Sequence, residues 1–411
     1  MHRTTERSMQ SSVRSETCLL LVTVELDRQD MANALGTGTE QELIKHYFVK
    51  GYDYNEILTF LSRYHGIDYS YRTLLRRLDH YGLKRRNTVT NSTHNDTEQR
   101  IRQLVDGPGS SGGYRTVWHS LQLDGFRVPR KIVSDILKEI DPEGTEARKR
   151  HRLKRRRYVN PGANYAWHID GYDKLKPWGF PIHGAIDGYS RKILWLKVTR
   201  SNNEPDNIAC FFLSTISDVN GCPVNLITDL GTENGIVAAI QSYFRDDEDS
   251  HRYVSSPRNQ RIESWWSQFC KQRACWWRNF FKDLNAAGDI DTTSEMKMEA
   301  LWYSFSEVLQ KDLDEVRTHW NTHFIRKSMY QTVSGRPDSL YFLPELSGGQ
   351  DYIQEVDAEK MRDVSENVVV TNYTNEYTEY FDFLVEQNNI ERPKDWQDSL
   401  TIYNFIVSLN D

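Results

Sequence analysis

The sequence predicts a mixed α/β protein, in which a sheet flanked by helices is preceded by an all-helical region and followed by a helix-rich acidic tail. Three observations support this prediction. Apolar residues recur at helical spacing between residues 39 and 141, the spacing becomes strand-like from residue 163, and strand and helix patterns then alternate up to residue 284. Three consecutive strands followed by alternating helices and strands are typical of a mixed sheet with helices on its faces.

The predicted sheet has five strands, and the sequence GYSR at 188–191 forms a turn between the second and the third. A core domain is therefore expected at 161–345, with an extension at 346–411. The strands are predicted at 164–172, 181–187, 192–198, 224–228 and near 252–254, and the helices at 206–219, 233–244 and 258–284.

The region at 39–90 is predicted to form three short helices after a flexible leader at 1–38. Helical spacing covers 40–50 and 55–65, and Ser70 is placed to cap a third helix. A turn followed by a helix with a basic outer face is the helix-turn-helix pattern, whose last helix enters a major groove of DNA. The expected inward residues are Leu74, Leu75 and Leu78, and the candidate DNA contacts are Arg72, Arg76, Arg77, Lys84, Arg85 and Arg86.

A second helical unit is predicted at 96–145, because segments at 97–105, 113–123 and 129–140 repeat the same plan. Pro129 suits the first turn of the last helix. Arg130 and Lys131 lie at the start of that helix and are candidate DNA contacts.

A basic linker is predicted at 146–160, where the run at 148–157 has eight Lys and Arg in ten residues. A solvated linker is the plainest interpretation. Because the run lies between a DNA-reading unit and the core, we favour contact with phosphate or a nuclear import signal. The candidate DNA contacts in the linker are Arg148, Arg150, Lys154, Arg155 and Arg156.

Charge and composition restrict the class of protein. The net charge is −6, but residues 40–160 hold 24 Lys and Arg against 15 Asp and Glu, and residues 341–411 hold 4 against 15. A basic front half favours a polyanionic partner. Five cysteines without a CxxC pair favour a reducing compartment. No apolar stretch reaches the ~18–20 residues that span a bilayer, and the short one at 18–25 resembles at most a weak signal peptide.

Three acidic residues occupy positions that a two-metal site requires. Asp170 lies in the first strand, Asp229 directly follows the fourth, and Glu263 lies on the first turns of the long helix, with 58 and 33 residues between them. Two divalent ions about 3.5–4 Å apart promote the breaking and joining of phosphodiesters, and Mg²⁺ prefers carboxylate oxygens. A single Asp at a strand end is more often a cap or turn residue, so the combination carries the prediction.

The helix of Glu263 has an apolar stripe that should pack on the sheet. Glu263 is one residue, or ~100°, from Ile262 and should emerge at the edge of the buried face. The aromatic residues of the stripe are expected in the core or an interface, and stacking on bases is the less favoured alternative. These residues are Trp265, Trp266, Trp276 and Trp277.

Several segments in this region resemble the integrase core of retroviral integrases and related transposases. The resemblance covers roughly residues 163–345. The segments are WHIDGY (167–172), AIDGYSRKILWLKV (185–198), ITDLGTENG (227–235), SPRNQRIESWW (256–266), HWNTHFIRKSM (319–329) and SGRPDSLYFLP (334–344).

The resemblance implies a ribonuclease H-like fold and a catalytic, metal-ligating triad of Asp170, Asp229 and Glu263 that holds two Mg²⁺ or Mn²⁺ ions. It also implies hydrolytic nicking followed by attack of a 3′-hydroxyl on target DNA. Asp187 falls in the family's Asp-x-x-Ser-Arg turn and is interpreted as structural. His168 and His183 are interpreted as residues of the strand faces.

The sequence departs from the family in its helix and its flanks. Positions that often carry a DNA-contacting Lys hold Ser267 and Cys270, so the nearby Lys271 and Arg273 become candidate DNA contacts. The retroviral amino-terminal zinc domain is absent, and helix-turn-helix units take its place. No basic SH3-like barrel follows the core.

These observations predict a DNA recombinase that acts on double-stranded DNA in the nucleus. Because two DNA ends must be joined, we expect a dimer or a higher homo-oligomer. Two alternatives stay open: a domesticated, transposon-derived DNA-binding protein that lacks catalysis, and a ribonuclease H-type nuclease acting on hybrids.

The tail at 346–411 begins with the linker-like sequence SGGQ (347–350). A strand is predicted at 368–373 and helices at 377–386 and 396–409. The acidity of the tail argues against phosphate binding. A module for partner binding or self-masking and a plain folded extension remain equally open.

Overall fold

The computed structural model describes residues 38–85, 91–106, 112–142, 160–327, 333–368 and 375–409. The chain forms two compact units, which divide between Asn87 and Thr88. The apolar stretch at 18–25 and the basic run at 148–157 lie outside the described residues. Within the described ranges, no helix has the length and apolar character needed to cross a membrane.

The first unit contains helices α2 (Glu40–Val49), α3 (Tyr54–His65) and α4 (Tyr71–His80). The predicted cap at Ser70 is confirmed, because its side chain accepts the N–H of Thr73. Leu74 and Leu78, four residues apart, face the core of the unit. The inward position expected for Leu75 is wrong: its side chain is 40% exposed, because it lies about 100° around the helix from Leu74.

The second unit is built on a five-stranded sheet of order β3-β2-β1-β4-β5. β1 pairs antiparallel with β2 and β2 antiparallel with β3, whereas β4 pairs parallel with β1 and with β5. All five predicted strands are confirmed. They are β1 (Ala166–Tyr172), β2 (Ile182–Asp187), β3 (Ile193–Val198), β4 (Asn225–Thr228) and β5 (His251–Tyr253).

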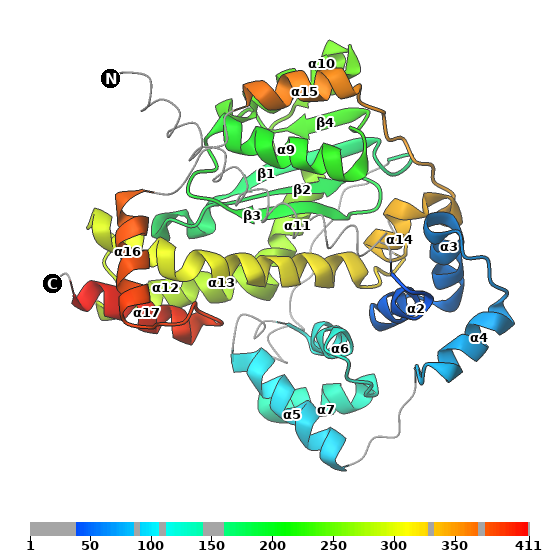
Figure 1. Ribbon diagram of the computed structural model, residues 1–411, viewed down its shortest axis with the longest axis horizontal. Helices are drawn as coiled ribbons and strands as arrows, with labels where there is room; N and C mark the ends of the chain where they lie inside the picture. Colours follow the sequence, from blue (N-terminus) through cyan, green and yellow to red (C-terminus); the bar gives the residue numbers. More distant parts are fainter. Residues whose placement is uncertain are drawn as a thin grey trace, which may run out of the picture. The chain divides into compact units, whose positions relative to one another are not determined.

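Helices cover both faces of this sheet, as the predicted ribonuclease H-like fold requires (Figure 1). Trp167 and Ile169 of β1 face a core shared with the helices of one side, and Tyr172 faces the core of the other. The first side has α9 (Pro205–Val219), α10 (Gly235–Arg245) and α15 (Ala358–Asn367), and the second has α11 (Gln260–Phe269), α12 (Cys275–Ala287) and α13 (Glu295–Thr322).

The helix predicted at 258–284 is interrupted. A π-helical turn, η6 (Cys270–Ala274), separates α11 from α12. The N–H of Cys275 donates to the carbonyl of Cys270, which widens the helix by one residue. The prediction that the tryptophans are core residues is confirmed for Trp265, Trp266 and Trp277, which are at most 4% exposed.

The predicted second helical unit forms α5 (Asn91–Asp106), α6 (Tyr114–Leu123) and α7 (Arg130–Ile140), with Pro129 as the N-cap of α7. It belongs to the same compact unit as the core. His119 Nε2 on α6 lies 2.9 Å from Thr322 Oγ1 on α13, and His319 Nε2 lies 3.1 Å from the Thr116 carbonyl.

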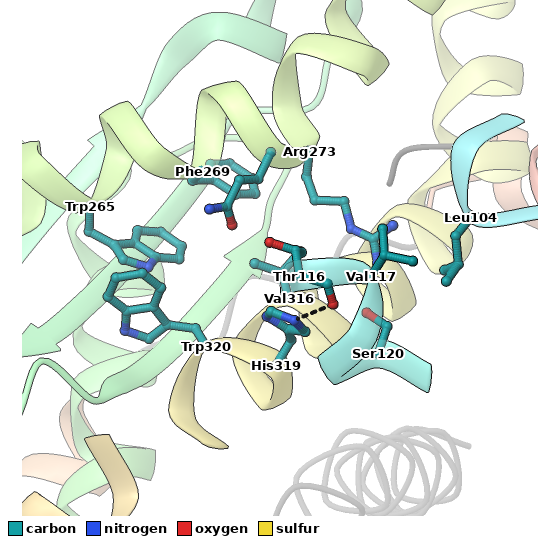
Figure 2. Close-up of a pocket in the computed structure, with 11 residues that line it drawn as sticks. Leu104, Thr116, Val117, Ser120, Trp265, Phe269, Arg273, Val316, His319 and Trp320 are labelled. Atoms are coloured by element: carbon teal, nitrogen blue, oxygen red, sulfur yellow. Dashed lines mark hydrogen bonds between the residues drawn. The ribbon is translucent and has the colours of Figure 1, made fainter. Parts of the chain in front are cut away.

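A cavity of about 40 Å³ remains between α6, α11 and α13 (Figure 2). Trp265 and Phe269 form its α11 wall, and Thr116 and Val117 form its α6 wall. A space of this size holds water but no larger ligand, so we interpret it as a packing gap behind the helix of Glu263.

The end of α13 is fastened to β3. The Asn321 side chain accepts the N–H of Ile193 and donates to its carbonyl, at 2.8 and 2.9 Å. Trp320 donates to the Arg191 carbonyl at 2.6 Å. The following helix, α14 (Pro337–Phe342), carries Asp338, which forms a buried ion pair with Lys192.

The acidic tail packs on the core. Its helices α16 (Glu376–Gln387) and α17 (Trp396–Ser408) confirm the two predicted tail helices, and Phe381 and Ile406 join the apolar cluster of α11–α13. The strand predicted at 368–373 falls almost entirely outside the described residues, and Val368 ends α15. Of the tail interpretations, a folded extension fits this packing best.

Candidate active site

Asp170 lies on the face of β1 that meets α11. Its carboxylate oxygen Oδ2 accepts a hydrogen bond from Trp266 Nε1 of α11 at 3.0 Å. Its partner on β2 is Gly184. A Cβ atom at Gly184 would lie 3.0 Å from the Trp266 ring, a contact tighter than ordinary packing allows. The glycine therefore lets the indole reach across β2 to Asp170.

Asp229 stands beside Asp170 at the end of a parallel strand pair. β1 and β4 pair parallel with His168 opposite Ile227, and Asp170 and Asp229 each lie two residues beyond that last paired position. Neighbouring strands are about 4.8 Å apart. Asp229 Oδ1 accepts hydrogen bonds from Asn234 Nδ2 at 2.9 Å and from the Gly231 N–H at 3.3 Å, which hold the carboxylate at the strand end.

Glu263 lies on the first turn of α11, and Asn259 anchors that turn to β1. The fully buried Asn259 side chain donates to the Ile169 carbonyl at 2.9 Å. Its Oδ1 lies 2.7 Å from His168 Nδ1. Because the amide oxygen can only accept, His168 Nδ1 carries a proton. The Asn259 carbonyl also accepts a hydrogen bond from the N–H of Glu263 at 3.2 Å. The Glu263 side chain accepts the hydroxyl of Ser256.

The pKa of the Asp170 carboxyl responds to the charges of the other two carboxylates. Burial, together with the charges of Glu263 and Asp229, raises the pKa of the Asp170 carboxyl to about 8. Among the described residues, none of the three carboxylates forms an ion pair with a Lys, Arg or His. Clustered carboxylates without a cationic side chain are an environment that a bound cation would stabilise.

The donor set fits hard divalent ions, since it consists of carboxylate oxygens. Its side chains are not arranged as a finished metal site. Across the described part of the chain, no three His, Cys, Asp or Glu side chains converge closely enough to hold an ion. The hydrogen bonds to Trp266, Asn234 and Ser256 instead hold each carboxylate in its own position.

Asp187 has the structural surroundings that its motif indicates. It is fully buried, and it accepts the N–H groups of Asn164, Tyr189 and Ser190 and the Ser190 hydroxyl. His183 is also fully buried, and its Nδ1 accepts from Trp195 Nε1 at 3.0 Å. Both contacts belong to the sheet and its turns.

The predicted DNA contacts separate into three groups. Arg72, Arg76, Lys84, Arg130, Lys131 and Lys271 are exposed. Arg77, Arg85 and Arg273 are engaged within their own units: Arg77 pairs with Glu40 at 3.0 Å, Arg85 donates to the Tyr52 carbonyl, and Arg273 pairs with Asp312 at 3.3 Å. Arg86, Arg148, Arg150, Lys154, Arg155 and Arg156 lie outside the described residues.

The sequence does not indicate the positioning roles of three residues: Asn234, Asn259 and Trp266. Asn259 had a local signal, because Asn is favoured immediately before a helix. Its side chain bonds β1 rather than its own helix, and that long-range contact has no sequence signature. The helical spacing of Trp266 predicts a core residue and gives no indication that its N–H donates to Asp170.

Comparison with known families agrees with this geometry. A model of the integrase core domain family matches residues 157–346, a range that contains β1–β5, all three carboxylates and α14. This part of the chain is therefore similar to the integrase core domain. No curated protein matches the chain.

Proposed function

We propose that the protein is a DNA recombinase that hydrolyses a phosphodiester at a DNA end and transfers the freed 3′-hydroxyl into target DNA. The observation that carries the proposal is that the charges of two carboxylates from other elements, Asp229 and Glu263, act on the Asp170 carboxyl. Asp170 lies near the end of β1, Asp229 directly follows the neighbouring parallel strand β4, and Asn259 anchors the turn of Glu263 to β1.

Asp170, Asp229 and Glu263 would hold two Mg²⁺ or Mn²⁺ ions in this mechanism. When bound, such ions supply an activated oxygen nucleophile near neutral pH and stabilise the charge of the transition state. The chain itself orients the carboxylates. Trp266 holds Asp170 from the α11 side, Asn234 holds Asp229, and the anchored first turn of α11 limits the movement of Glu263.

The exposed basic residues are the proposed DNA contacts. Arg77, Arg85 and Arg273 are left out because they are only partly exposed and their guanidinium groups form ion pairs or hydrogen bonds within the protein. Contacts to phosphate bring affinity without sequence preference. We further propose nuclear localisation and a dimer or higher assembly, since both ends of a DNA segment must be handled together. The retained contacts are Arg72, Arg76, Lys84, Arg130, Lys131 and Lys271.

Two DNA substrates test the proposal. Supercoiled plasmid reports nicking without a specific end, and labelled duplexes made from the sequence flanking the gene report joining. With Mg²⁺ or Mn²⁺, we expect nicked and joined products that disappear in Glu263→Gln. The matched control is Glu248→Gln, which changes an exposed acidic residue outside the triad and should keep full activity.

The alternative is a domesticated DNA-binding protein that lacks catalysis. The observation that favours it is that each triad carboxylate is hydrogen bonded to the protein, and the described residues contain no converged metal site. Metal-independent binding to duplex DNA, with no nicking in Mg²⁺ or Mn²⁺ by the unaltered protein, would overturn the recombinase proposal in favour of this one.

A further inference from the structure

The π turn between α11 and α12 brings two cysteines together. Cys270 and Cys275 are five residues apart, and their sulfur atoms lie 2.9 Å from each other. In a regular α-helix, residues five apart point about 140° away from each other. The bond from the Cys275 N–H to the Cys270 carbonyl closes a π turn instead, and this turn stacks the second residue over the first.

We propose that Cys270 and Cys275 are a redox-active dithiol, which peroxide converts into a disulfide within the helix and thiol reductants restore. The proposal stands on the paired sulfur atoms and on the turn that aligns them. Both cysteines are free and partly exposed, so a small oxidant can reach them. In a reducing compartment, a pair of this kind is held as thiols until oxidant appears.

The reaction has two steps. The thiolate of Cys270 attacks one oxygen of hydrogen peroxide, so that an S–O bond forms, the O–O bond breaks, and the released hydroxide takes up a proton to become water. Sulfur is oxidised to a sulfenic acid, and peroxide is reduced by the same two electrons. The sulfur of Cys275 then attacks the Cys270 sulfur. The S–S bond forms, the S–O bond breaks, and hydroxide leaves with the thiol proton as a second water.

The surroundings assign these roles. Burial and the proximity of Cys270 raise the pKa of the Cys275 thiol to about 11, against the opposing charges of Arg278 and Lys271. A thiol that stays protonated near neutral pH is a slow first nucleophile but reacts once a sulfenic acid forms beside it. Cys275 is therefore the resolving residue.

The other described cysteines supply controls. Cys210 on α9 is also partly exposed, and burial raises the pKa of its thiol to about 11 as well. Cys222 is buried. Among the described cysteines, only the pair on the π turn has sulfur atoms in contact. Cys210→Ser is therefore matched to Cys275→Ser in exposure and in the direction of its pKa, but not in proximity to a second thiol.

Trypsin offers a direct readout, because Lys271 and Arg273 lie between the two cysteines. Full-length protein is treated with hydrogen peroxide, alkylated, digested and analysed by mass spectrometry. In reduced protein, Cys270 and Cys275 appear in separate alkylated peptides, 262–271 and 274–278. After oxidation, we expect one linked product that lacks two hydrogens relative to the separate, unalkylated peptides and that dithiothreitol separates.

The linked product should persist in Cys210→Ser and be lost completely in Cys270→Ser and Cys275→Ser. Non-reducing gels at low protein concentration should show the monomer, which places the bond within one chain. A trivalent arsenical, which bridges close dithiols without oxidation, should protect both cysteines from alkylation in unaltered protein and in Cys210→Ser, and should give no protection in Cys270→Ser or Cys275→Ser. Full alkylation of both cysteines after peroxide, or a bond between chains, would overturn the proposal. Neither readout uses DNA, so the result is independent of the proposed function.

Discussion

The same four residues, Ile-Asp-Gly-Tyr, occur on two neighbouring strands and have opposite surroundings. At Asp187 the carboxylate is fully buried and accepts four hydrogen bonds from its own turn and from Asn164. At Asp170 the carboxylate accepts one hydrogen bond from Trp266, and the charges of Glu263 and Asp229 raise its pKa. One aspartate is satisfied by hydrogen bonds from the protein, and ionisation of the other is opposed by burial and by two like charges.

This difference teaches that acidic motifs are distinguished by their partners. A carboxylate with a full set of N–H and O–H donors contributes to stability and has no remaining capacity for chemistry. A carboxylate placed against like charges lowers stability, and functional sites often accept that cost. The predictions below test this distinction between Asp170 and Asp187, beginning with the largest expected effect.

Replacement of Asp170 by Asn should abolish DNA nicking and joining while the fold is kept. Asn keeps the shape of the side chain and removes the like-charge repulsion with Glu263 and Asp229. We therefore expect activity below detection and a melting temperature equal to or above that of the unaltered protein, measured by joining assay and by calorimetry. A large fall in melting temperature would show that Asp170, like Asp187, is mainly structural.

Replacement of Asp187 by Asn should mainly reduce stability. An amide at this site presents its NH₂ group to backbone N–H donors, which leaves buried groups unpaired. We expect the free energy of unfolding to fall by about 3 kcal/mol, measured by denaturant titration. A folded, stable Asp187→Asn protein that fails only in joining would contradict the assigned role.

Replacement of Asn259 by Ala should weaken the anchor of α11 and lower the joining rate by about 10–100-fold. The control is Asn225→Ala. Asn225 is a buried asparagine at the start of β4, and its side chain donates to the backbone carbonyl of Tyr165. Both variants should lose similar stability, and only Asn259→Ala should lose catalysis beyond that loss. Equal joining rates in the two variants would remove Asn259 from the positioning role.

The last prediction concerns the pH dependence of stability, which affects how any pH profile of Asp170 is interpreted. Burial lowers the pKa of His119 to about 2 and of His319 to about 3, and in both cases a neighbouring histidine adds to the effect. The unfolded chain takes up these protons near the ordinary pKa of about 6.5, whereas the folded chain does not. Stability is therefore complete above that pH and falls as the pH drops toward 3.

We expect each of these histidines to contribute a slope of up to about 1.4 kcal/mol per pH unit in that window. Replacement of His119 by Asn should flatten the acid side of the stability profile, measured by denaturant titration at several pH values. An unchanged slope in His119→Asn would show that other groups govern acid unfolding.

Much of the fold could be predicted because local patterns repeat. The alternation of apolar residues located all five strands, and the cap at Ser70 located the start of α4. The order and spacing of Asp170, Asp229 and Glu263 identified the candidate triad before any contact was known. The inward position predicted for Leu75 is wrong because the spacing of apolar residues does not tell how wide a face a helix buries.

The sequence by itself determined the class of core, the order of its elements and the three acidic residues, since periodicity and motif spacing are properties of the chain alone. Tertiary structure decided which groups surround each carboxylate, how Asn259 and Trp266 hold α11 against β1, and where α11 changes into a π turn that pairs Cys270 with Cys275. The physical reason is range: helix and strand patterns arise from neighbours in sequence, whereas hydrogen bonds across 90 or more residues form only when the sheet and its helices are packed together.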